Sequence, residues 1–87
     1  MKEFVTFEKN FGGRKMERYF HKLENAKRVM IDDFQNTIKA LNGKVEEERE
    51  LYDKELSCNV FFKRASFPNG EECMWALIDS YFEDEED

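Results

Sequence analysis

The chain has 87 residues, of which 40% are hydrophobic and 39% charged, and its formal net charge is −6. A chain this short has room for one domain and one core, here expected over residues 1–87, and its nine Phe, one Trp and three Tyr argue against a disordered chain. No apolar run approaches the ~20 residues of a membrane span, and residues 1–4 do not begin a signal peptide, so we expect a cytoplasmic protein with free thiols at Cys58 and Cys73.

The charges are distributed unevenly along the chain. Residues 65–87 carry eight acids and no bases, which leaves residues 1–64 with fourteen bases against twelve acids. The sequence is therefore acidic at its C-terminal end and slightly basic elsewhere. We expect residues 83–87 to form a frayed acidic tail.

The first half of the chain predicts a hairpin followed by a helix. Residues 4–9 are β-branched and aromatic, Gly12 and Gly13 suit a tight reversal, and residues 14–20 form the return strand. Apolar side chains then recur at helical spacing from Leu23 to Leu41, which predicts one long helix over about residues 23–41. Asn42 and Gly43 are expected to end it, with the glycine in the left-handed conformation.

The second half of the chain predicts strands. In residues 45–51 acids occupy alternate positions, which predicts a short solvent-facing strand, and a turn follows near Asp53. In residues 56–62 apolar residues occupy alternate positions, which predicts a second strand. Pro68 and Gly70 predict a three-residue hairpin loop, which pairs Val60 with Ile78 and Phe61 with Leu77. A helix over residues 71–82 is the alternative, since Met74, Leu77, Ile78 and Tyr81 also lie at helical spacing. We favour the strand, because the helix would leave Trp75 outside its buried stripe.

These elements predict an α+β fold in which a small antiparallel sheet, built from two hairpins, packs one face against the long helix. One helix covers only one face of such a sheet. We therefore expect something else to cover the aromatic face of the last hairpin, which holds Phe61, Phe67, Trp75, Leu77 and Tyr81. The cover could be another part of the chain, a second copy or an external partner.

The sequence lacks the common catalytic and cofactor motifs. It has a single histidine, His21, no CxxC pair, and no glycine-rich nucleotide loop or nucleophile elbow. Adjacent acids such as Asp32 and Asp33 point away from each other on a helix. We therefore expect neither an enzyme nor a bound metal or cofactor.

Besides the aromatic face of the last hairpin, the sequence offers a second candidate binding surface, which is acidic. It comprises Glu71, Glu72, Asp79, Glu83, Asp84, Glu85, Glu86 and Asp87. Such a surface attracts basic protein partners and repels nucleic acid. The alternative is that the acidic run only keeps the chain soluble. A basic cluster at residues 14–28 suggests nucleic-acid binding, but Glu17 and Glu24 dilute it and the pI near 4.9 argues against that function.

In its short length, its Phe-rich hairpins and its acidic terminus at residues 83–87, the chain resembles the small acidic proteins of phages and mobile elements. These include anti-CRISPR and anti-restriction inhibitors. The resemblance implies a stoichiometric inhibitor that occupies the basic nucleic-acid-binding surface of a defence protein by charge mimicry. The alternative is a small adaptor or homodimeric interaction module that docks through Phe61, Trp75 and Leu77.

Overall fold

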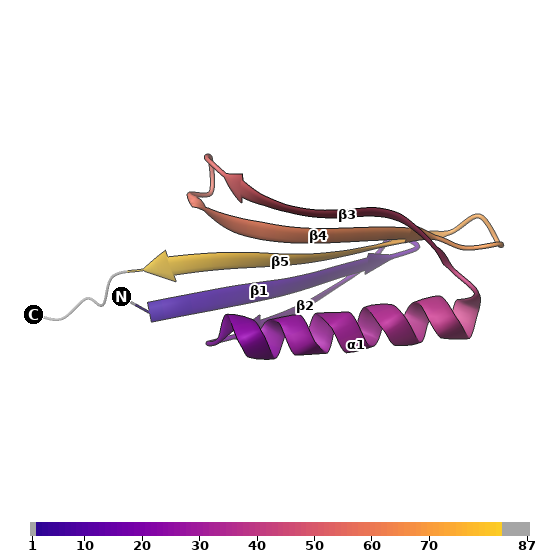
Figure 1. Cartoon of the computed structure of the whole chain (residues 1–87), viewed down its shortest axis with the longest axis horizontal. Helices are drawn as coiled ribbons and strands as arrows, with labels where there is room; N and C mark the ends of the chain where they lie inside the picture. The colour runs from indigo at the N-terminus through magenta and orange to yellow at the C-terminus, as the bar shows by residue number, and fades with distance from the viewer. Residues whose placement is uncertain (1, 83–87) are drawn as a thin grey trace, which may run out of the picture.

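A computed structural model describes residues 2–82 and shows one five-stranded antiparallel sheet with one helix (Figure 1). The elements in chain order are β1 (Lys2–Phe11), β2 (Arg14–Phe20), α1 (Leu23–Leu41), β3 (Lys44–Asp53), β4 (Cys58–Ser66) and β5 (Glu72–Phe82). The strand order is β2-β1-β5-β4-β3, and α1 packs along one face of the sheet. The predicted α+β fold is confirmed.

The last hairpin forms with the predicted register. β4 pairs with β5 so that Val60 lies opposite Ile78 and Phe61 opposite Leu77. Gly70 takes a φ of 88° in the loop, where the Asn69 Oδ1 atom accepts the Glu71 N–H at 3.0 Å. Residues 72–82 are therefore a strand, because only a strand buries Cys73, Trp75 and Leu77 together on one side.

The turn between β3 and β4 places the start of β4 later in the chain than the sequence predicted. The Asp53 Oδ1 atom accepts the N–H groups of Glu55 and Leu56 at 2.9 and 3.1 Å, which holds these residues in a turn. Leu56 is consequently 54% exposed, and β4 begins at Cys58. Cys58 and Cys73 are both buried free thiols.

Both ends of α1 depend on other parts of the chain. Lys22, at the start, makes no side-chain capping hydrogen bond, and Glu3 of β1 accepts the Leu23 N–H at 3.3 Å instead. At the other end Asn42, not Gly43, is left-handed, with a φ of 54°. Gly43 is required for a different reason, since a Cβ atom there would lie 2.6 Å from the Phe67 ring.

The core lies between α1 and the sheet. Trp75 and Leu77 of β5 and Val5 of β1 are fully buried there, beneath Met30 and Phe34 of α1. Phe34 meets the Trp75 ring edge-on, with centroids 4.9 Å apart. The Trp75 indole N–H donates to Asp33 at 2.8 Å, and Lys9 forms an ion pair with the same Asp33 oxygen at 2.7 Å. Within residues 2–82, no helix is both long and apolar enough to cross a membrane.

We expect Asp33→Ala to lower the free energy of unfolding by about 1–3 kcal/mol, because it leaves a buried indole N–H without an acceptor. The neighbouring variant Asp32→Ala, at an exposed position, is the control and should change it by less than about 0.5 kcal/mol. Urea titrations of both variants measure the difference. Equal effects would show that Asp33 does not anchor α1.

We expect Gly43→Ala to destabilise the fold by about 1–3 kcal/mol, because the added Cβ atom would push against Phe67 and Ile38. Asn42→Gly is the matched control at the adjacent position. It should be neutral or slightly stabilising, since glycine adopts the left-handed conformation more readily. In thermal melts, the melting temperature should therefore fall for Gly43→Ala and stay the same or rise slightly for Asn42→Gly.

Candidate protein-binding face

The structure places the predicted aromatic face under α1. Trp75 and Leu77 are 0% exposed, so a partner could reach them only by displacing the helix, and Phe61 is 9% exposed. The expectation that this face needs a cover other than the helix is wrong. Phe67 is buried beside Phe11 at the same interface, whereas Tyr81 is 53% exposed and donates its hydroxyl to Glu3.

The sequence contained a signal for the covered face. In β1, Val5 and Phe7 alternate with the polar residues Thr6 and Glu8, so the apolar side of this strand is the side with odd numbers. β1 lies beside β5 with Phe7 opposite Leu77. The apolar side of β1 therefore shares its face with Trp75 and Leu77, and this is the face that α1 has to cover.

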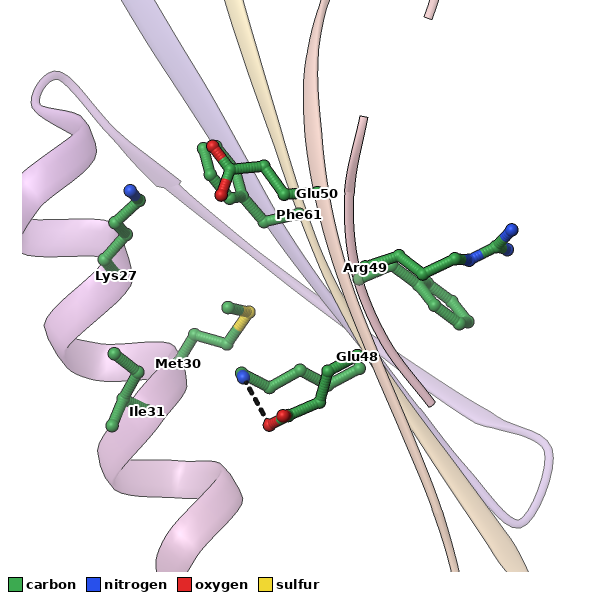
Figure 2. Close-up of a pocket in the computed structure, with 9 residues that line it drawn as sticks. Lys27, Met30, Ile31, Glu48, Arg49, Glu50 and Phe61 are labelled. Carbon is green, nitrogen blue, oxygen red and sulfur yellow. Dashed lines mark hydrogen bonds and ion pairs between the residues drawn. The ribbon is translucent and has the colours of Figure 1, made fainter. Parts of the chain in front are cut away.

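A groove of about 350 Å³ remains beside α1, because five strands are wider than one helix (Figure 2). Lys27 and Ile31 of α1 line one wall, and Glu48 and Glu50 of β3 line the other. The Lys27 ammonium lies 4.2 Å from the centroid of the Phe61 ring, which forms the floor. Charged side chains lie on both walls of the groove, above a floor of apolar side chains.

The opposite side of the sheet, which we call the open face, has an apolar centre. Side chains of β4 and β5 pair across it, with Val60 opposite Ile78 and Phe62 opposite Ala76, and all four are only half-buried. Leu51 and Met74, 37% and 38% exposed, extend this surface on either side. No element of residues 2–82 packs over it, since α1 lies on the other side.

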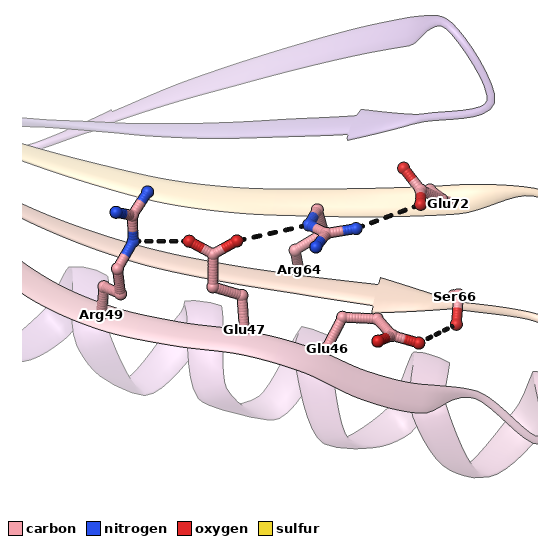
Figure 3. A network of polar contacts seen from close by, with 6 residues as sticks. All are labelled: Glu46, Glu47, Arg49, Arg64, Ser66 and Glu72. Carbon is pink, nitrogen blue, oxygen red and sulfur yellow. Dashed lines mark hydrogen bonds and ion pairs between the residues drawn. The ribbon is translucent and has the colours of Figure 1, made fainter.

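A chain of ion pairs crosses one end of the open face (Figure 3). Glu47 of β3 binds Arg49 at 2.5 Å and Arg64 of β4 at 3.5 Å, and Arg64 binds Glu72 of β5 at 3.1 Å. A β-bulge between Val45 and Glu47 breaks the regular alternation of β3 at this point. As a result Glu46, which accepts the Ser66 hydroxyl at 2.6 Å, lies on the same face as Glu47.

Polar groups also border the other side of the open face. Lys15 of β2 lies 3.1 Å from Glu17 and 3.6 Å from Glu8. The Tyr19 hydroxyl donates to Glu17 at 2.7 Å, and this hydrogen bond lowers the pKa of the Glu17 carboxyl. The Tyr19 ring stacks on Phe4. A hollow of about 220 Å³ lies between Lys15 and the apolar side chains of Phe62 and Met74. The open face thus combines an apolar centre with a paired, charged rim.

The predicted acidic surface is divided in the structure. Glu71 is exposed at the hairpin loop, Glu72 is held by Arg64, and Asp79 is 2% exposed and therefore not available to a basic partner. Residues 83–87 lie outside the described part of the chain. The described members of this set do not form one continuous acidic patch.

Asp79 is instead a buried carboxyl group near the start of α1. Its Oδ1 atom has no hydrogen-bond partner within residues 2–82. Burial raises the pKa of Asp79 from 3.8 to about 6, and the nearby Glu3 carboxylate acts in the same direction, whereas the Lys27 ammonium opposes the shift.

In comparisons with known proteins, no family model, curated protein or solved structure matches the chain. Within the described residues, no three histidine, cysteine or carboxylate side chains come together as a metal site requires. Within residues 2–82, the open face is the strongest candidate for a functional site.

We expect Asp79→Asn to stabilise the protein above pH 6 and to have little effect near pH 4. The folded protein holds a proton on Asp79 that the unfolded chain releases between pH 3.8 and about 6, so stability falls as the pH rises through this window. The amide removes a cost on the order of 1–3 kcal/mol at neutral pH. Melting temperatures of the variant and of the unsubstituted chain, recorded as a function of pH, measure this stabilisation. An equal rise in melting temperature at every pH would contradict the prediction.

Proposed function

We propose that this chain is a non-enzymatic binding protein that docks another protein on its open face. The observation that carries the proposal is the half-exposed apolar centre around Phe62 and Ile78, which no element of residues 2–82 covers. An apolar centre inside a polar rim is the usual anatomy of a protein interface. The proposal keeps the binding role expected from the sequence and moves it to the other side of the sheet.

The rim supports this function because its charges are already paired. Arg64 lies between Glu47 and Glu72, and Lys15 lies between Glu8 and Glu17. Charges that are satisfied within one protein do not have to find new partners when an interface covers them. Completing the burial of a half-exposed Phe62, Ile78 or Leu51 would contribute roughly 1 kcal/mol each.

A partner that is a basic, nucleic-acid-binding defence protein remains a separate prediction. Within the described residues, Glu72 is neutralised by Arg64 and Asp79 is buried. Charge mimicry would therefore depend mainly on Glu83–Asp87 together with Glu71. The two ideas assign binding to different residues and can be separated by substitution.

We expect Phe62→Glu to abolish capture of the natural partner from a cell extract, because a glutamate at the centre of an interface would be buried without a counter-charge. Leu56→Glu is the matched control, since Leu56 is exposed in the β3–β4 turn away from the open face. Quantitative mass spectrometry of the captured proteins, with thermal melts to confirm folding, provides the measurement.

Deleting residues 83–87 separates the open face from charge mimicry. If the open face binds, the truncated chain retains its partner and Phe62→Glu loses it. The reverse pattern, retention by Phe62→Glu and loss on truncation, would reject the open face and support the acidic terminus.

A further inference from the structure

The two edge strands of the sheet carry opposite charges. β2, at one edge, has three bases and one acid, and β3, at the other, has five acids and two bases. Within residues 2–82 no strand pairs with the outer side of either one. Unpaired edges are templates for adding a further strand, so their charge patterns decide which strands can join them.

The hairpin geometry identifies the groups that β2 presents outward. Gly12 and Gly13 both take positive φ values, 56° and 87°, as a two-residue type I′ turn requires. Phe11 and Arg14 then form the hydrogen-bonded pair next to the turn, and bonded pairs alternate from there. The backbone N–H and C=O groups of Lys15, Glu17 and Tyr19 therefore point away from β1.

Pairing of like edges between two copies is disfavoured in the registers that overlap the edge strands most fully. If β3 pairs antiparallel with β3 and is centred on Arg49, Glu48 lies opposite Glu50, and centring on either glutamate places it opposite itself. If β2 pairs with β2 around Met16, Arg14 lies opposite Arg18. Like charges directly opposite each other destabilise a strand pair.

Pairing of unlike edges avoids these contacts. Copies that lie side by side in the same orientation bring β2 next to β3 in parallel, because the strand order makes these two edges parallel within one chain. In one such register Arg18 lies opposite Glu50 on the helix side of the sheet, and Lys15 lies opposite Glu47 on the other side. Glu17 then lies opposite Arg49, and these side chains are 36% and 59% exposed in the single chain. Within residues 2–82 neither Arg18 nor Glu50 has an ion-pair partner, although the Arg18 guanidinium lies 5.2 Å from the Phe20 ring centroid.

We propose that copies of this chain join edge to edge, with β2 of one copy paired to β3 of the next. The contact uses two different edges, so each added copy presents a free edge again and the assembly can grow beyond two. A homodimer built through the open face would stop at two copies. The edge contact uses strand backbones and exposed charges, so it is independent of the function proposed for the open face.

Sedimentation velocity of the full chain over a range of concentrations tests the proposal. At about 0.1 M salt the average mass should rise with concentration beyond twice the 10.5 kDa of one chain, and it should fall back at about 1 M salt, where exposed charges are screened. A mass of one chain at every concentration, or a dimer that is insensitive to salt, would overturn it.

Charge reversal at the paired positions makes the test specific. Arg18→Glu and Glu50→Arg should each sediment as single chains, because each places like charges opposite each other at every junction. An equimolar mixture of the two should regain the large species. In the mixture, the glutamate introduced into β2 of one variant meets the arginine introduced into β3 of the other, and the next junction restores the original contact of Arg18 with Glu50. Failure of the mixture to assemble would refute the proposed pairing.

A third variant tests the backbone contribution to the same contact. Glu17→Pro removes an N–H group that points away from β1, so no hydrogen bond within the hairpin is lost. We expect this variant to remain a single chain while its thermal melt shows that it is folded. Assembly at the level of the unsubstituted chain would show that the outer side of β2 is not paired.

Discussion

Trp75 anchors α1 to the side of the sheet that the helix covers. A buried indole needs an acceptor for its N–H group, and Asp33 of α1 provides one at 2.8 Å, while Lys9 of β1 neutralises that carboxylate. Phe34 packs edge-on against the same ring. Because side chains alternate along a strand, holding Trp75 beneath α1 also places Cys73 and Leu77 there and turns Ala76 and Ile78 to the open face.

The elements of the fold were largely predictable because their signals are local. The loop at Pro68 and Gly70 determined the register of β4 with β5, and the spacing of apolar residues from Leu23 to Leu41 located α1. The covered face was not predictable from the last hairpin alone, since Phe61 and Phe62 are both apolar and either side could have been buried. That choice depends on β1 lying beside β5, which is a contact between distant segments.

Other differences between sequence and structure have the same origin. The cap at the start of α1 comes from Glu3, twenty residues away in the chain, and Gly43 is needed because Phe67 approaches it closely. The acidity predicted along the chain is likewise rearranged in space. Asp79 is buried, and the described charges are polarised across the sheet, because the strand order separates basic β2 from acidic β3.

The bulge at Glu46 links the rim of the open face to the pattern of the β3 edge. Because side chains alternate with a period of two, one extra residue reverses the direction of every side chain that follows it. If pairing continued in step from Val45, Leu51 would turn to the helix side, and Glu48 and Glu50 would lie on the open face. The bulge therefore keeps Leu51 with Val60 in the apolar centre and places Glu47 beside Arg64. It also leaves Glu50 at the outer edge, on the side of the sheet where Arg18 lies on β2.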